Sequence, residues 1–98
     1  MTITKIADGS KLTIALGGLL DTVTAPDLEK ELNASLDGVT ELTFDFENLE
    51  YISSAGLRAL LLAQKIMNQH GEMKIVHPAD IIKEIFEVTG FDKMMTIE

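Results

Sequence analysis

Hydrophobic residues recur with two different spacings along this sequence, and the order in which these spacings alternate constrains the fold more than any other feature. Segments with a period of two are typical of half-buried strands, and segments with a period near 3.6 are typical of amphipathic helices. The predicted strands are residues 2–7, 11–16, 42–46, 73–76 and 94–97. The predicted helices are residues 24–37, 53–70 and 78–89. This order, β-β-α-β-α-β-α-β, predicts an α/β fold in which a single layer of mixed β-sheet is packed with α-helices.

Glycine and proline set the expected element boundaries. Asp8-Gly9 is a turn signal between the first two strands, and Gly17-Gly18 is expected to end the second strand. Thr24, followed by Pro26, is typical of a helix start, and residues 47–50 are expected to form a loop. The predicted buried faces of the first and third helices consist of Leu28, Leu32, Leu36, Ile81, Ile82, Ile85 and Phe86.

Size and composition exclude several classes of protein. At 98 residues the chain has room for one core, so we expect a single domain over residues 1–98. There is no cysteine, which excludes disulfide scaffolds and thiolate chemistry. A net charge of −8 without a basic patch argues against nucleic acid or an anionic membrane as partner. The longest apolar run is residues 59–63 and no signal peptide is visible, so we expect a cytoplasmic protein.

No motif for catalysis or cofactor binding is present. The phosphate loop, the dinucleotide fingerprint and the zinc-protease helix are all absent. His70 and His77 are the two histidines, and no spacing links either to a cluster of carboxylates. We therefore expect no catalytic residue, no metal and no cofactor.

Two adjacent serines occupy the junction between a predicted strand and the second helix. A serine N-cap accepts a hydrogen bond from a first-turn N–H, and the residue before it packs against the fourth helical residue. With Ser53 as the cap, this apolar pair is Ile52 and Leu57. With Ser54 as the cap, the pair is Ser53 and Arg58, which is not apolar. We predict that Ser53 caps the helix and that Ser54 is its first residue, with a free hydroxyl.

The predicted surroundings of Ser54 suit a protein partner. At 100° per residue, Arg58 and Lys65 fall within about 40° of Ser54. Leucines flank or interrupt this polar arc, and they are covered either by the chain itself or by a partner. These leucines are Leu57, Leu61 and Leu62. Gly56, in the first turn, indicates either close helix–strand packing or close approach of a partner's backbone.

A phosphoryl group on Ser54 is expected to act as a switch. The helix N-terminus stabilises an anion by ~0.3–2 kcal/mol. An incompletely paired charge that is desolvated in an interface costs several kcal/mol. The cost exceeds the gain, so phosphorylation is expected to expel a partner.

The chain resembles the STAS domain family, and in particular its stand-alone bacterial anti-sigma factor antagonists. The resemblance extends over nearly the whole chain and is carried by Gly17-Gly18-Leu19-Leu20-Asp21, Asp45, Ser53-Ser54-Ala55-Gly56-Leu57 and Thr89-Gly90-Phe91. It implies that the unphosphorylated protein binds an anti-sigma factor that is also a serine kinase. It further implies that this kinase phosphorylates the serine and that a PP2C-type phosphatase resets the cycle.

Position by position, the resemblance places the family's phosphoacceptor on Ser54. The family's preceding Asp is replaced by Ser53, which keeps a capping oxygen but removes a charge. Asp21 matches a recurrent family position at the same end of the sheet, where it either contacts the partner or forms the turn over residues 22–25. Related domains commonly continue into a C-terminal helix, whereas this sequence stops at Glu98.

Three alternative functions are weighed against this hypothesis. A serine hydrolase of the G-x-S-x-G type needs glycine where Ile52 stands, together with a positioned histidine. A phosphopantetheine carrier resembles an all-helical bundle, which the predicted strands contradict. The strongest alternative keeps the STAS scaffold but places it in a sensor complex or transport system, without serine phosphorylation.

Overall fold

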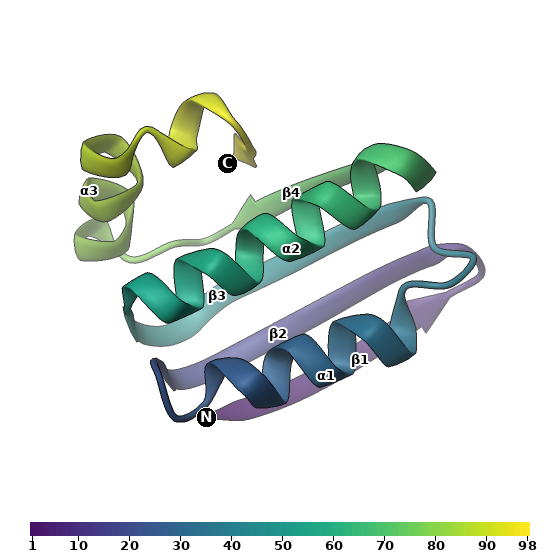
Figure 1. Cartoon of the computed structure of the whole chain (residues 1–98), viewed down its shortest axis with the longest axis horizontal. Helices are drawn as coiled ribbons and strands as arrows, with labels where there is room; N and C mark the ends of the chain where they lie inside the picture. The colour runs from purple at the N-terminus through teal and green to yellow at the C-terminus, as the bar shows by residue number, and fades with distance from the viewer.

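The computed structural model describes residues 1–98 and contains one five-stranded mixed sheet. Its strands lie in the order β1-β2-β3-β4-β5, with β1 antiparallel to β2 and all other neighbours parallel (Figure 1). They are β1 (Thr2–Asp8), β2 (Lys11–Leu20), β3 (Glu41–Ile52), β4 (Glu72–Val76) and β5 (Thr96–Ile97). This arrangement confirms the predicted fold class and element order.

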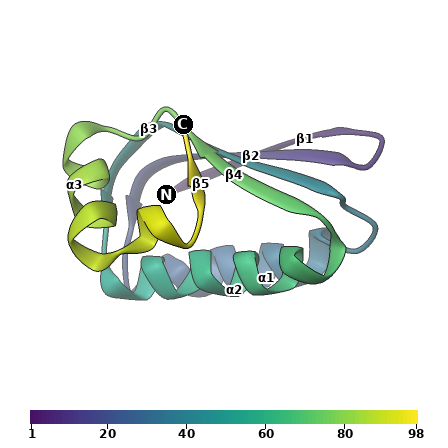
Figure 2. The same cartoon turned by 90° about the horizontal axis from the view of Figure 1, so that it is seen from above.

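The helices cover one face of the sheet. They are α1 (Ala25–Ser35), α2 (Ser54–His70) and α3 (Asp80–Thr89), with a short 3-10 helix, η1 (Phe91–Lys93), after α3. Figure 2 shows α1 and α2 beneath the sheet and α3 at one end, while the opposite face carries no helix. None of the helices combines the length and apolar character needed to cross a membrane.

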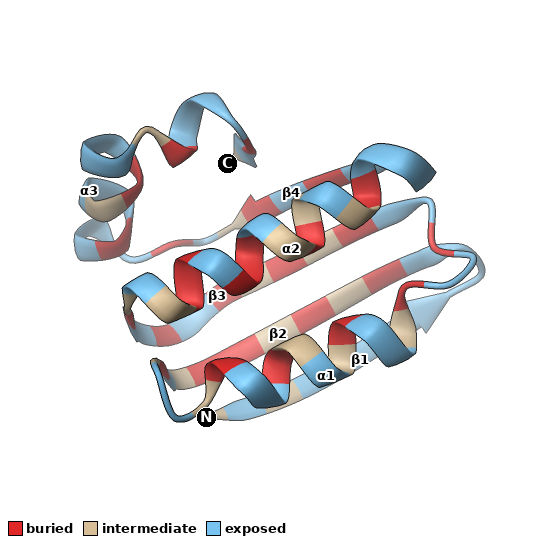
Figure 3. Ribbon diagram, in the orientation of Figure 1, coloured by how far each residue is buried: buried red, intermediate tan, exposed pale blue.

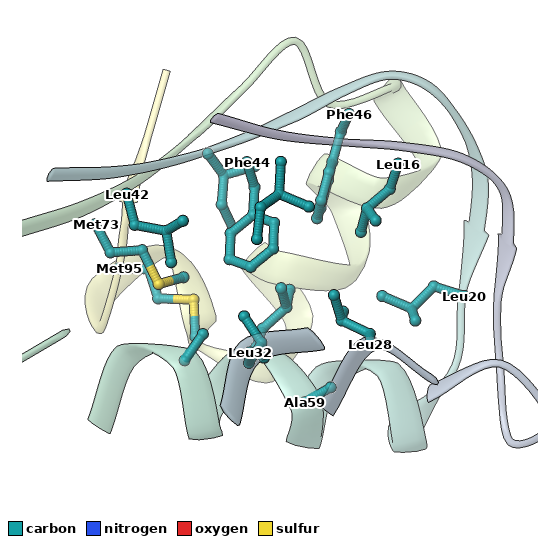
Figure 4. Packing of buried hydrophobic residues seen from close by; sticks show 14 of the residues in the cluster. Leu16, Leu20, Leu28, Leu32, Leu42, Phe44, Phe46, Ala59, Met73 and Met95 are labelled. Carbon is teal, nitrogen blue, oxygen red and sulfur yellow. The ribbon is translucent and has the colours of Figure 1, made fainter. Parts of the chain in front are cut away.

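The hydrophobic core lies between the sheet and the helices. Alternate residues of β2 and β3 point into it, which gives the striped burial in Figure 3. These include Leu12, Ile14, Leu16, Leu42, Phe44 and Phe46, and Figure 4 shows several of them against Leu28, Leu32 and Ala59 of the helices. Phe86 of α3 stacks 6.4 Å from Phe46 and 6.4 Å from Phe91, so an aromatic row holds α3 to the end of the sheet.

Two central strands are longer than the sequence predicts. β2 continues through Gly17-Gly18, and residues 47–50 belong to β3 instead of forming a loop. The two extensions pair with each other, from Gly17 opposite Asn48 to Leu20 opposite Ile52, with register shifts on either side of Gly17-Gly18. These register shifts change the spacing of buried residues in β3 from two positions to three. Residues 47–50 therefore lack the period of two by which a strand is predicted.

Smaller corrections concern the helix ends and the last strand. Thr24 is the N-cap of α1, but its side chain makes no capping hydrogen bond. Pro78 precedes α3, which begins at Asp80 with Ala79 as its N-cap. Ile81 is exposed, although it was expected on the buried face of α3, whereas Ile82 and Phe86 are buried as predicted. β5 has only two residues because the segment predicted as a strand starts too early: Met94 is still the helical C-cap of η1, and β5 begins at Thr96.

Candidate functional site

Two loops meet where the parallel strands β2 and β3 end. The Ser53 N–H donates a hydrogen bond to the Leu20 carbonyl oxygen at 2.9 Å, which joins the start of α2 to the end of β2. The loop from β2 to α1 and the first turn of α2 therefore lie at the same end of the molecule, the left end in Figure 1. This end holds both of the sequence segments that were singled out as functional.

Ser53 caps α2, as predicted. Its backbone is extended, with φ −97° and ψ 177°, and its hydroxyl oxygen accepts a hydrogen bond from the Gly56 N–H at 3.4 Å. The helix therefore begins at Ser54. Ser54 is exposed, and its hydroxyl has no hydrogen-bond partner within the chain. The structure thus gives the two serines different environments, with Ser53 used by the fold and Ser54 facing solvent.

Gly56 and Leu57 lie inside the protein. A β-carbon at position 56 would come within 2.8 Å of side-chain atoms of Leu20 and Ile52. Of the two interpretations of Gly56, close helix–strand packing is the one that the structure supports. Leu57 is only 9% exposed and belongs to the core, so the expectation that it flanks an exposed arc is wrong. Both residues therefore offer little surface to a partner.

An exposed stripe does run along α2. It consists of Ser54, Arg58, Leu61 and Lys65, whose spacing of four, three and four places them on one helix face, and we call it the α2 stripe. Leu61 is 38% exposed between the two cations, and Leu62 beside it is half-buried. Neither Arg58 nor Lys65 forms a salt bridge with a carboxylate of the chain.

Asp21 organises the turn before α1. Its Oδ1 accepts hydrogen bonds from the N–H groups of Val23 (3.0 Å) and Thr24 (3.1 Å) and from the Thr24 hydroxyl (3.2 Å). Hydrogen bonds keep the pKa of Asp21 below its ordinary value, and the bond from the Thr24 backbone N–H has the largest effect. The carboxylate is therefore ionised at neutral pH. The structure thus shows that Asp21 forms the turn. Its Oδ2 makes no hydrogen bond within the chain, and contact of Asp21 with a partner remains a prediction.

Val23 is a residue that the sequence analysis missed. The Asp21 turn presents it with 82% of its surface exposed, at the end of the molecule where α2 begins. An apolar side chain that stays this exposed buries little surface and so adds little to the stability of the fold. The available signal was an apolar residue inside the polar turn Asp21-Thr22-Val23-Thr24.

The structure also corrects the expectation about the histidines. His70 stands alone at the end of α2, but His77 lies 3.1 Å from Asp45, with its Nδ1 facing the carboxylate Oδ1. Glu47 lies close to both residues. Residues 45 and 77 are far apart in sequence, and the parallel pairing of β3 with β4 brings them together.

The chain belongs to the STAS domain family, which it matches over residues 2–98. BtrV of Bordetella bronchiseptica, which bears the name of an anti-sigma factor antagonist, is 40% identical over 93 residues, or 93% of this chain and 78% of BtrV. The anti-sigma-B factor antagonist of Staphylococcus aureus is 34% identical over 86 residues, or 86% of this chain and 80% of that protein.

The fold is also similar to that of SpoIIAA, a Bacillus cell fate determinant whose structure was solved in the phosphorylated form. The TM-score is 0.77 at 18% identity, over 99% of this chain and 91% of SpoIIAA. The resemblance inferred from the sequence is therefore confirmed at the level of family and fold.

Proposed function

We propose that this protein is an anti-sigma factor antagonist that binds an anti-sigma factor through the α2 stripe and is released when Ser54 is phosphorylated. The observation that carries the proposal is the position of Ser54. Its free hydroxyl stands on the first residue of α2, while Ser53 next to it is engaged in capping. The names of its relatives BtrV and the Staphylococcus aureus protein support the same class of function.

The exposed residues around Ser54 indicate what kind of partner surface they fit. Arg58 and Lys65 carry positive charge without a salt-bridge partner, on a protein whose net charge is −8. Leu61 lies between them, and Val23 is exposed at the same end of the molecule. An anti-sigma factor that binds here therefore presents acidic groups around an apolar depression.

The same geometry explains the proposed switch. A phosphoryl group on Ser54 adds about −1.5 to −2 charges at pH 7. It would stand within one helical turn of Arg58 and face the acidic groups that recognise the cations of the α2 stripe. Like-charge repulsion and desolvation then act against binding, and they exceed the ~0.3–2 kcal/mol that the helix N-terminus supplies.

The remaining parts of the proposal follow from family membership. The bound anti-sigma factor is the serine kinase that modifies Ser54, and a PP2C-type phosphatase restores the free hydroxyl. The protein itself is a regulatory binding module and not an enzyme, and it acts in the cytoplasm, where these partners operate. Asp21 contributes by holding the turn that presents Val23.

Mapping of the phosphorylation site tests the proposal. The purified chain is incubated with ATP and the serine kinase that it retains from lysate of its native cell, and the products are analysed by peptide mass spectrometry. We expect one phosphoryl group, on Ser54, in the wild type and in Ser53→Asp, and none in Ser54→Ala. Phosphate on Ser53, or on neither serine, contradicts the proposal and favours a STAS scaffold without serine phosphorylation.

A further inference from the structure

Three potential metal ligands gather on the face of the sheet that carries no helix. Phe44 and Phe46 of β3 point into the core, so Asp45 between them lies on the opposite face, and Glu47 follows it two residues later. His77 directly follows β4, whose last residue Val76 pairs with Asp45. The parallel register therefore brings an imidazole from one strand end beside two carboxylates from its neighbour.

The ligand atoms of these three residues lie close enough to share one ion. One ligand atom from each of Asp45, Glu47 and His77 lies within 4.8 Å of the other two. The Asp45 Oδ1 and His77 Nδ1 are 3.1 Å apart. Two ligand atoms that bind Zn²⁺ at ~2.0–2.1 Å with tetrahedral angles are about 3.3 Å apart. The ion can thus replace the direct contact with only a small movement of the two side chains.

The backbone holds two of the ligands in place. The Glu47 N–H donates a hydrogen bond to Asp45 Oδ1 at 3.0 Å, which fixes the orientation of the carboxylate. His77 has a φ of +58°, the only positive φ at a non-glycine residue in the structure. This left-handed conformation turns the chain immediately after β4.

We propose that Asp45, Glu47 and His77 form a binding site for one divalent transition-metal ion, of which Zn²⁺ is the best match. An imidazole with two carboxylates suits Zn²⁺, Mn²⁺, Co²⁺ or Ni²⁺, whereas Mg²⁺ and Ca²⁺ prefer all-oxygen ligand sets. Three protein ligands leave at least one coordination position open to water or to a group of another molecule. The two carboxylates supply negative charge that complements the cation.

The surface next to the cluster has room for the rest of a coordination sphere. A hollow of about 70 Å³ adjoins the cluster and is lined by Asp45 and Glu47 together with Thr2, Thr4, Ala15, Leu16, Gly17 and Asn48. A hollow needs only about 10–15 Å³ of volume accessible to a water molecule to hold one, so this hollow has room for metal-bound water. The hydroxyl and amide groups of Thr2, Thr4 and Asn48 are available to hydrogen-bond to this water.

The bound ion would connect the middle of β3 with the residue that follows β4, on the face opposite α1 and α2. The α2 stripe, by contrast, belongs to the layer of helices (Figure 2). The metal site is therefore independent of the proposed function of Ser54, and the failure of one proposal leaves the other standing.

Calorimetric titration of the full chain with ZnCl₂, after removal of metals by a chelator, tests the site. We expect one ion per chain, and at least about tenfold weaker binding in His77→Asn and in Glu47→Gln. Asparagine suits position 77 because it tolerates positive φ and keeps a hydrogen-bonding group near Asp45. The matched control is His70→Asn, which removes the other histidine and should leave binding unchanged.

Two further measurements separate a built site from general attraction to an acidic protein. In proton NMR, Zn²⁺ should shift the ring signals of His77 and not those of His70, and MgCl₂ should shift neither. Urea unfolding without metal shows whether the variants fold. If His77→Asn does not fold, Glu47→Gln tests the site instead, because it changes an exposed side chain. The proposal is overturned if Zn²⁺ binding is absent, if both site variants keep wild-type affinity, or if His70→Asn removes binding.

Discussion

Gly56 of α2 packs against the backbone of Leu20 at the end of β2. A β-carbon at position 56 would lie 2.9 Å from the Leu20 carbonyl oxygen, closer than real β-carbon contacts allow. The same carbonyl accepts the hydrogen bond from Ser53 N–H. The absence of a side chain at position 56 therefore sets how closely α2 approaches β2, and with it the position of Ser54 relative to the Asp21 turn.

The variant Gly56→Ala tests this contact. The added methyl group meets backbone and side-chain atoms, and such overpacking costs ~1–3 kcal/mol. Three atoms lie closer than 3.0 Å to the added methyl group, so the cost falls in the upper part of this range, and alanine recovers only about 1 kcal/mol through its higher helix propensity. We therefore expect a net loss of about 1–2 kcal/mol in urea unfolding. Arg58→Ala in the same helix is exposed and should change stability by no more than about 0.5 kcal/mol. A Gly56→Ala variant as stable as the wild type contradicts the packing interpretation.

The two serines should respond differently to substitution. Ser53→Ala removes the acceptor for the Gly56 N–H and should cost ~0.5–2 kcal/mol, whereas Ser53→Asp should restore stability because aspartate also caps helices. Ser54→Ala should cost little, since alanine is well tolerated at the first helical position. Urea unfolding of the three variants provides the comparison. If Ser54→Ala is the destabilising change, the helix start is wrongly assigned.

The Asp21 turn gives the protein an acid-sensitive element. Because hydrogen bonding lowers the pKa of Asp21 in the folded state, its carboxylate stabilises the fold above the pKa of the unfolded chain. This contribution is lost as pH falls below about 4 and through the lower folded-state pKa. Asp21→Asn should be less stable than the wild type at pH 7, and this difference in stability should narrow as the pH falls below about 4. Thermal unfolding across this range of pH measures the difference, and a difference that widens in acid refutes the assignment.

The Ser53 cap shows which features of this structure can be predicted from the sequence alone. The cap is a local feature, and the neighbours of Ser53 were enough to place it. By contrast, the extension of β3 through residues 47–50 depends on a bulged pairing with β2 that disrupts the local hydrophobic period. The meeting of His77 with Asp45 likewise depends on long-range packing, which no local pattern records. The burial of Leu57 agrees with the Ile52–Leu57 pair that placed the cap, and not with the helical wheel, which put Leu57 beside the exposed arc.

The exposed apolar residues should contribute to partner binding and not to folding. Val23→Ala and Leu61→Ala each remove an exposed side chain, so stability should change by no more than about 0.5 kcal/mol. If they anchor the anti-sigma factor, each should weaken binding by more than about 1 kcal/mol, or about fivefold. Ile6→Ala, another exposed apolar residue but on β1, is the matched control and should bind normally. Surface plasmon resonance with the immobilised anti-sigma factor gives the three affinities, and equal losses in all of them would refute a localised surface.

The switch at Ser54 is tested most directly by calorimetric binding of two variants to the anti-sigma factor of the same organism. Ser54→Ala keeps an uncharged side chain at the start of the α2 stripe and should bind like the unphosphorylated wild type. Ser54→Asp places a negative charge there and should lose more than about 2.7 kcal/mol, or a hundredfold in Kd. Equal affinities of Ser54→Asp and Ser54→Ala would contradict the switch.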